Sequence, residues 1–144
     1  MGRNMYSWIK LKYHKDNRGI LMAIQDNTVK DNNLPMRFKR IFILSKLNPK
    51  KERGNHTLKT TTQAFFCLKG SCEIELDDGF KRKKLKLNQF NKGLLVYPMV
   101  WRTLKNFSKD AIILVIADKT YKESDYIRNY ENFIQQVRRG IQKI

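Results

Sequence analysis

Short apolar runs alternate with turn-forming residues along most of the chain. The runs are GILMAIQ (19–25), RIFILSKL (40–47), QAFFCL (63–68), CEIEL (72–76), KLKL (84–87), LLVYP (94–98) and AIILVIA (111–117). Clusters of Asn, Asp, Gly, Pro and Lys separate them at intervals of roughly 8–12 residues, which is typical of a β-sandwich or barrel. The pattern therefore predicts an all-β protein.

One hairpin is predicted in more detail. In CEIELDDGFKRKKLKL (72–87), apolar and polar residues alternate on both sides of Asp78-Gly79. An Asp-Gly pair is a frequent turn between two antiparallel strands, and alternation places one face of each strand in the core.

The C-terminal segment has a different period. Its apolar positions are Tyr126, Ile127, Tyr130, Phe133, Ile134 and Val137. Spacings of three and four place these side chains on one face of a helix. Ser124 or Asp125 is a candidate N-cap, and Gly140 is a candidate stop. We therefore predict a C-terminal helix over about 124–139.

Length and composition indicate one domain spanning 1–144. The chain has no Pro/Gly/Ser-rich linker, no repeat and no apolar run near the ~20 residues of a membrane helix. Its N-terminal residues lack the apolar region of a signal peptide. We expect a cytoplasmic protein without a membrane partner, in which Cys67 and Cys72 are free, buried strand residues.

The net charge is +17, from 30 Lys and Arg against 13 Asp and Glu. Such an excess is compatible with nucleic acid, with a smaller anion such as a nucleotide diphosphate, or simply with a basic surface. The basic residues are spread over the whole chain, without a recognisable nucleic-acid-binding motif. No specific nucleic-acid partner is therefore predicted.

The stretch RGNHTLK (53–59) contains one of the two histidines in the chain, His56. In an extended strand His56 and Leu58 point to the same side, while Thr57 and Lys59 point to the other. The interior of a small barrel commonly holds a ligand, and an imidazole there can exchange a proton near neutral pH. A partly exposed histidine satisfied by its neighbours is the structural alternative. His14 lies in a polar stretch and is predicted to be at the surface.

At this point the sequence resembles the cupin-fold sugar 3,4-ketoisomerases (WxcM-like), which act on dTDP-4-keto-6-deoxyglucose. The resemblance rests on DNRGILMAI (16–24), LPMRFKRIFIL (34–44), RGNHTLK (53–59), QAFFCLKGSCEIELDDG (63–79), KGLLVYPMVW (92–101), NFSKDAIILVIAD (106–118) and YKESDYIRNYENF (121–133). It implies a cupin jelly-roll (double-stranded β-helix) barrel with one C-terminal α-helix. It also implies a homodimer that shares N-terminal strands between subunits.

Several residues match the family pattern and others depart from it. The matching positions are Arg40, Arg53, Gly54, His56, Lys59, Gln63 and Trp101. The family usually has a second histidine at the position of Leu58 and a Trp-His pair where this chain has Trp101-Arg102. Two tyrosine positions of the family are Phe42 and Ile43 here.

The same comparison argues against a metal. Metal-binding cupins place their ligands at positions that hold His56, Leu58, Gln63 and Arg102 in this chain. One imidazole and one amide are poor ligands for a divalent ion, and a guanidinium repels it. No metal and no cofactor are predicted.

The resemblance implies an isomerase that moves the keto group of a dTDP-linked 4-keto-6-deoxy sugar from C4 to C3 through an enediolate, in the synthesis of deoxysugars for surface glycans such as lipopolysaccharide. We expect His56 to carry the proton and Arg102 to stabilise the negative charge. Substrate binding is assigned to Arg40, Arg53, Asn55, Lys59, Gln63 and Trp101.

Alternatives remain open at several of these positions. Arg40 and Arg53 suit a diphosphate, because the forked guanidinium matches phosphate oxygens, but each is equally compatible with a structural salt bridge. Trp101 either stacks on the ligand or belongs to the core. For the whole chain, the alternative function is a degenerate cupin that binds a nucleotide sugar without catalysis.

Overall fold

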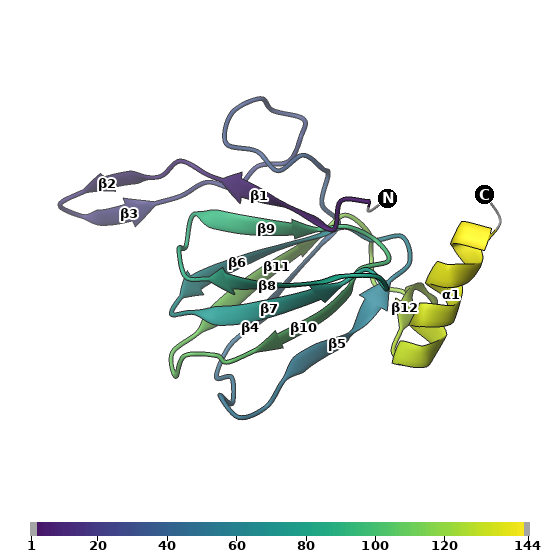
Figure 1. Ribbon diagram of the computed structural model, residues 1–144. Helices are drawn as coiled ribbons and strands as arrows, with labels where there is room; N and C mark the ends of the chain where they lie inside the picture. Colours follow the sequence, from purple (N-terminus) through teal and green to yellow (C-terminus); the bar gives the residue numbers. More distant parts are fainter. Residues whose placement is uncertain (1–2, 143–144) are drawn as a thin grey trace.

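Two five-stranded antiparallel sheets form the body of the protein (Figure 1). A computed structural model describes residues 3–142. The first sheet has the order β1-β9-β6-β11-β4, with β1 (Tyr6–Lys10), β4 (Arg40–Leu44), β6 (Gln63–Lys69), β9 (Lys92–Val96) and β11 (Ile112–Ala117). The second has the order β12-β5-β10-β7-β8, with β5 (Arg53–Leu58), β7 (Cys72–Asp77), β8 (Arg82–Leu87), β10 (Trp101–Lys105) and β12 (Tyr126–Ile127). The prediction of an all-β architecture is confirmed.

The main core lies between the two sheets. Its largest cluster takes Phe65 from β6 and Val115 from β11 on one side, and Ile74 from β7 and Leu104 from β10 on the other. These side chains are almost fully removed from water, and burial of apolar surface at about 25 cal/mol per Å² is the main force that holds the sheets together. Both cysteines are buried and free, as predicted.

The Asp78-Gly79 hairpin is confirmed. β7 and β8 pair antiparallel from Cys72↔Leu87 to Asp77↔Arg82. Gly79 has φ +94°, a conformation that favours glycine. The Asp78 Oδ1 atom accepts backbone N–H bonds from Phe80 and Lys81, at 2.9 Å each, which fixes the turn.

The C-terminal helix α1 (Tyr130–Gln142) begins later than the predicted start at Ser124. Its N-cap is Asn129, whose Oδ1 atom accepts the backbone N–H of Asn132 at 2.9 Å. The helix also continues through Gly140, which does not end it. The predicted range of about 124–139 is therefore corrected to 130–142.

Asp125, a predicted cap of this helix, has another role. Its carboxylate accepts the backbone N–H of Thr60 at 2.8 Å and the hydroxyl of Thr61 at 2.5 Å. A short 3-10 turn, η1 (Glu123–Asp125), and then β12 precede the helix, and β12 pairs with β5. The three-and-four spacing therefore spans a strand and a helix that share one buried cluster.

Helix α1 lies beside β12 (Figure 1) and packs on Trp101 of β10 and Ile127 of β12. Phe133 is fully buried and packs with Ile127 and with Trp101, whose ring centroid lies 5.5 Å from that of Phe133. The outer side of the first sheet is covered by the segment before β4, through Leu34 and Met36. Within the described part of the chain, no helix is long and apolar enough to cross a membrane.

A ribbon of β2 (His14–Asp16) and β3 (Gly19–Leu21) projects away from the barrel (Figure 1). All its residues are exposed, including His14, as predicted. The strand expected over 19–25 thus ends at Leu21. Beyond it the Asn32 side chain, rather than a neighbouring strand, bonds the carbonyl of Ala23 at 2.9 Å.

Candidate active site

A small cavity of about 80 Å³ lies between the sheets at one end of the barrel. Its polar lining comes from Arg53 and His56 on β5, Gln63 on β6 and Arg102 on β10. The remaining walls are apolar, with Phe42 and other side chains of β4, β6, β10 and β11. The predicted residues His56, Arg53, Gln63 and Arg102 therefore do come together.

The His56 ring has a defined orientation and tautomer. Its Nδ1 atom lies 3.0 Å from the carbonyl oxygen of Gly54. A carbonyl can only accept, so Nδ1 carries the proton and Nε2 has a free lone pair. One edge of the ring packs against Tyr126, with centroids 5.0 Å apart. The neutral imidazole is thus arranged as a base that uses Nε2.

The surroundings of His56 favour this neutral form. Burial, followed by the positive charges of Arg102 and Arg128, lowers its pKa to about 4, while the Gly54 bond and Glu123 act in the opposite direction. At neutral pH the imidazole is therefore ready to take a proton rather than to give one.

Arg102 is a buried cation without a carboxylate partner. It is 1% exposed and forms no ion pair with any described residue. Its guanidinium donates to the Gln63 Oε1 atom at 2.7 Å and to the Val100 carbonyl at 2.8 Å and 3.2 Å. Burial lowers its pKa to about 9, so it stays charged at neutral pH. The Arg102 side chain is one of those that line the cavity.

Gln63 completes the polar wall. Because the guanidinium can only donate, the Gln63 oxygen must face Arg102, and the amide nitrogen is left for another partner. That nitrogen bonds to nothing within residues 3–142. Gln63 is 2% exposed, so its amide is held in one orientation and offers a donor near Arg102.

A bulge in β5 sets the register of these groups. His56 lies opposite Arg102, but Thr103 lies opposite Gly54, so Asn55 is the extra residue. Gly54 and Asn55 both have positive φ, +89° and +55°. A Cβ atom on Gly54 would lie 2.9 Å from the carbonyl oxygen of Arg102, which explains the glycine there.

We expect Gly54→Ala to destabilise the protein by about 1–3 kcal/mol, because alanine strains the positive φ and contacts the β10 backbone. Chemical denaturation measures the change. Gly140→Ala is the matched control, since nothing lies within 4 Å of its added Cβ atom and alanine favours a helix. Equal effects of the two substitutions would contradict this account of the bulge.

The other predicted binding residues do not all reach the cavity. Arg40 lies on β4 near the Tyr126 hydroxyl, with the Nη2 atom 3.3 Å from that oxygen and the Nε atom buried without a partner in the described chain. Lys59 is exposed beyond the end of β5. Asn55 and Trp101 lie on the opposite, outer face of the second sheet. Leu58 is fully buried but does not line the cavity.

A group of residues before α1 was not predicted as part of the site. Tyr126 covers His56, and the Arg128 guanidinium lies 4.4 Å from the centre of the Tyr126 ring. Glu123 binds Arg128 through two bonds of 2.8 Å and 3.0 Å and accepts the Tyr121 hydroxyl. Arg128 and Tyr121 together lower the pKa of Glu123 to about 2, so this carboxylate remains charged.

This covering group leads to a prediction about pH. Tyr126→Ala exposes one side of the His56 ring to water and so reduces burial, the largest cause of its low pKa, and the pKa should rise from about 4 toward its ordinary value. Tyr126→Phe keeps the ring and should leave the pKa low. Because only neutral imidazole can act as the base, the acidic limb of kcat/KM should move to higher pH in Tyr126→Ala alone.

The His56 pKa can also be followed directly by NMR titration of the imidazole. Arg102, Arg128 and Glu123 are unchanged in both Tyr126 variants, so a difference between them reports on burial. An identical imidazole pKa in Tyr126→Ala and the parent protein would contradict the covering role of Tyr126.

Comparison with known proteins identifies the family of the chain. The family model described as FdtA: WxcM-like, C-terminal, matches residues 4–138. The chain belongs to this family. A TDP-4-oxo-6-deoxy-alpha-D-glucose-3,4-oxoisomerase from Aneurinibacillus thermoaerophilus is 38% identical over 125 residues, which cover 87% of each chain.

Solved structures of WxcM-like relatives agree with the fold. A 3,4-ketoisomerase from Helicobacter canadensis is 36% identical with a TM-score of 0.85, over 92% of this chain and 97% of that one. A second structure is a histidine-to-asparagine variant of the 3,4-ketoisomerase QdtA from Thermoanaerobacterium thermosaccharolyticum in complex with TDP-4-keto-6-deoxyglucose. It is 31% identical with a TM-score of 0.89, and the match covers 96% of this chain and 97% of that one. The cupin-fold prediction and the family resemblance are both confirmed.

Within residues 3–142, no three His, Cys, Asp or Glu side chains lie together as a possible metal site. The donor set at the cavity is one imidazole and one amide beside a guanidinium. Such a set does not suit a divalent cation. The expectation that the WxcM-like site works without a metal remains a prediction.

Proposed function

We propose that this protein is a TDP-sugar 3,4-ketoisomerase that moves the keto group of TDP-4-keto-6-deoxyglucose, or a close analogue, from C4 to C3. The observation that carries the proposal is the neutral His56 imidazole, with Nε2 free, in a cavity whose wall holds the buried charge of Arg102. The relatives named above are ketoisomerases of this type, and one was solved with that sugar nucleotide.

The residues suit each chemical step. The C3 hydrogen is acidic because the C4 carbonyl is adjacent, and the His56 Nε2 atom takes it as a proton. The resulting enediolate is stabilised by the Arg102 charge and by the free amide donor of Gln63. The O3 hydroxyl then loses its proton and O4 gains one. Return of a proton to C4 completes the C4 hydroxyl carbon and forms the carbonyl at C3.

One imidazole can serve both transfers when C3 and C4 present their hydrogens on the same face. His56 becomes an imidazolium after the first transfer, and its low pKa makes it a strong acid for the second. No redox cofactor is needed, because nothing is oxidised overall. Arg102 cannot replace His56 as the acid, because its pKa stays too high.

The diphosphate is assigned to two arginines, one that lines the cavity and one that lies outside it near Tyr126. Arg53 lines the cavity from β5. Arg40 has a buried Nε–H without a partner, although a buried donor normally finds one. A phosphate oxygen would supply that partner and would match the guanidinium fork. Neither arginine forms a salt bridge with a described carboxylate, which favours ligand binding over a scaffold role.

We also propose that two copies associate through the N-terminal ribbon. Ile20 and Leu21 on β3 are 52% and 64% exposed, and Ile41 and Ile43 on the edge strand β4 are 55% and 61% exposed. An isolated two-stranded ribbon is marginally stable in water, and an exposed apolar edge strand favours pairing with another chain. Analytical ultracentrifugation should therefore give twice the 17.2 kDa chain mass.

The wider setting is inferred from the proposed substrate. Nucleotide sugars of this kind are activated precursors, so we place the reaction in the cytoplasm and in deoxysugar synthesis for surface glycans such as lipopolysaccharide. A dTDP-linked sugar is the expected partner, without metal, nucleic acid or membrane.

The decisive experiment is incubation of the protein with TDP-4-keto-6-deoxyglucose in heavy water, followed by NMR. We expect the ketone signal to move from C4 to C3 and the C3 hydrogen to be exchanged or transferred. Tight binding of the sugar nucleotide without exchange would favour the alternative of a degenerate cupin. Exchange at C3 with the ketone retained at C4 would indicate an epimerase instead.

A further inference from the structure

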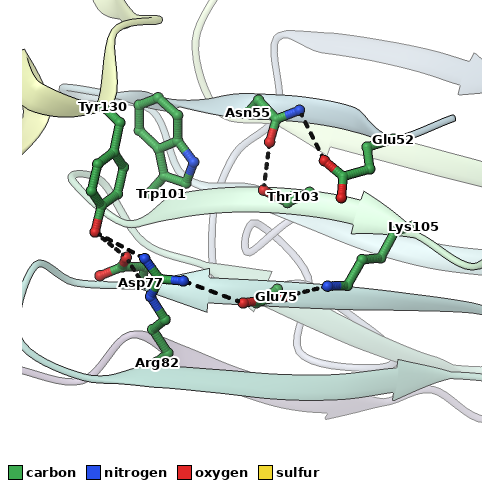
Figure 2. A pocket seen from close by; sticks show the side chains of 9 residues that line it. All are labelled: Glu52, Asn55, Glu75, Asp77, Arg82, Trp101, Thr103, Lys105 and Tyr130. Atoms are coloured by element: carbon green, nitrogen blue, oxygen red, sulfur yellow. Dashed lines mark hydrogen bonds and ion pairs between the residues drawn. The ribbon is translucent and has the colours of Figure 1, made fainter.

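A second hollow, of about 370 Å³, lies on the outer face of the sheet that carries His56 (Figure 2). Asn55 and Glu52 form one side, β10 crosses it with Trp101, Thr103 and Lys105, and β7 and β8 complete it. We call this hollow the outer groove. It lies directly behind the candidate active site, because Asn55 precedes His56 and Trp101 precedes Arg102 on opposite faces of the sheet.

Most charges in the outer groove are already paired. Lys105 contacts Glu75 at 2.6 Å, and Arg82 contacts Asp77 at 3.1 Å. The Tyr130 hydroxyl donates to Asp77 at 2.6 Å. These contacts appear as a connected row in Figure 2. A ligand that entered as an ion would have to compete with existing ion pairs.

Two groups in the outer groove are left for a ligand. Trp101 is only 9% exposed, and its indole N–H makes no hydrogen bond to any described residue. Figure 2 shows the nitrogen on the edge of the ring that faces away from Tyr130, toward Asn55 and Thr103. This nitrogen is not one of the fully buried atoms that lack a partner, so it is accessible from the outer groove. The Trp101 indole is therefore a donor that an acceptor of a ligand in the groove can reach.

The second group is the Glu52 carboxylate. Its one hydrogen bond in the described chain comes from the Asn55 amide at 3.5 Å, the long limit for such a contact. Between the two free groups, the Thr103 hydroxyl donates to the Asn55 Oδ1 atom at 2.8 Å and fixes that amide. The outer groove thus offers a donor on the Trp101 side and an acceptor on the Glu52 side of a rigid centre.

We propose that the outer groove is a second binding site, for a neutral sugar or polyol with adjacent hydroxyl groups. One hydroxyl accepts from the Trp101 indole and the next donates to Glu52, because a hydroxyl can do both. A phosphate is disfavoured by the carboxylates of Glu52, Glu75 and Asp77, and a simple amine would leave the indole donor unpaired. The site is independent of the proposed reaction on the inner face.

The Trp101 indole resonance gives a direct test. The chain has two tryptophans, so a ¹⁵N-labelled sample shows two indole cross-peaks, which Trp8→Phe assigns. On titration with D-glucose, we expect the Trp101 peak to shift and saturate, with a dissociation constant on the order of 1–10 mM. Trp8, on β1 of the other sheet, is the internal reference and should not move.

Variants and competitors make the test specific. Glu52→Ala should weaken glucose binding roughly tenfold or more, since it removes a hydrogen bond to a charged group. Glu73→Ala is the matched control, because Glu73 is a carboxylate of β7 that binds Asn106 outside the outer groove. Saturating TDP should leave the shift unchanged, and 1-propanol, with a single hydroxyl, should not reproduce it.

The proposal is overturned by a Trp101 peak that does not saturate, by equal effects of Glu52→Ala and Glu73→Ala, or by loss of the shift when TDP is added. The last result would place glucose in the inner cavity. Failure of the ketoisomerase assay, in contrast, would leave the outer groove unaffected, so the two ideas fail separately.

Discussion

Replacing His56 with asparagine is expected to reduce turnover of TDP-4-keto-6-deoxyglucose by on the order of 10⁴-fold, the upper range for general acid–base catalysis. The reason is that the described cavity contains one imidazole and no other side chain that exchanges protons near neutral pH. Asparagine is close in size and can still donate to the Gly54 carbonyl, so the bulge in β5 should persist. The measurement is formation of the 3-keto product by NMR.

The control for this substitution is the second histidine. His14 lies on the exposed ribbon, away from the cavity, so His14→Asn should leave turnover unchanged. Both variants should bind TDP as the parent protein does, which calorimetry can verify. A His56→Asn protein that binds TDP normally and keeps more than about a tenth of the activity would show that another group is the base. Tyr126, whose ring contacts His56, would then be the first candidate.

Part of the sheets could be predicted because some strands follow one simple rule, the alternation of buried and exposed residues. In β7, buried and partly exposed residues alternate as they do in the sequence, and Asp78-Gly79 closes the hairpin with β8. The rule fails where burial is not periodic. The run 19–25 is as apolar as the others, yet β3 ends at Leu21, because this part of the chain leaves the barrel. Periodicity predicts an extended segment, but it does not show whether another strand lies beside that segment to pair with it.

In the C-terminal segment, a single three-and-four spacing of apolar residues covers both a strand and a helix. Tyr126 and Ile127 have the spacing of the helix that follows, but they pair with β5 as a strand. Asp125 could have capped a helix, but it binds Thr60 and Thr61 instead. These contacts join residues more than sixty positions apart, so local sequence cannot reveal them. The covering group around Tyr126 was missed for the same reason.

The candidate site could also be predicted only in part from local sequence. Alternation along β5 correctly places His56 toward the interior, and Arg102 on β10 lies opposite it. The bulge at Gly54 and Asn55 interrupts that alternation. Asn55 and Trp101 face the outer groove, as alternation from His56 and Arg102 requires, whereas the bulge returns Arg53 to the cavity side. Residue type identified the polar candidates, and alternation gives the face of most of them, but the face of Arg53 depends on the bulge.

Arg102 illustrates a conflict between stability and function. A buried guanidinium without a carboxylate loses its hydration and regains only part of it from the Gln63 and Val100 oxygens. Its low pKa reflects this loss. Replacement of a buried charge and its partner by apolar side chains is often neutral or stabilising. The role proposed for Arg102 in stabilising the enediolate would explain why a residue that costs stability occupies this position.

We therefore expect Arg102→Met to lower turnover by about 10²–10³-fold, the cost of removing one stabilising donor from a developing oxyanion. The direction of a second effect, on the pH dependence of kcat/KM, can also be predicted. The Arg102 charge lowers the His56 pKa, so its loss should raise that pKa and move the acidic limb of kcat/KM to higher pH. A pH series of kcat/KM for parent and variant measures both effects.

Stability should change differently from activity. Arg102→Met leaves the Gln63 oxygen unpaired, whereas the double variant Arg102→Met/Gln63→Leu removes both polar groups together. The double variant should unfold at the same denaturant concentration as the parent or at a higher one, yet be at least as inactive as Arg102→Met, because the Gln63 donor is lost too. If it unfolded much more easily, Arg102 would be a structural residue, and its place beside His56 would reflect packing rather than catalysis.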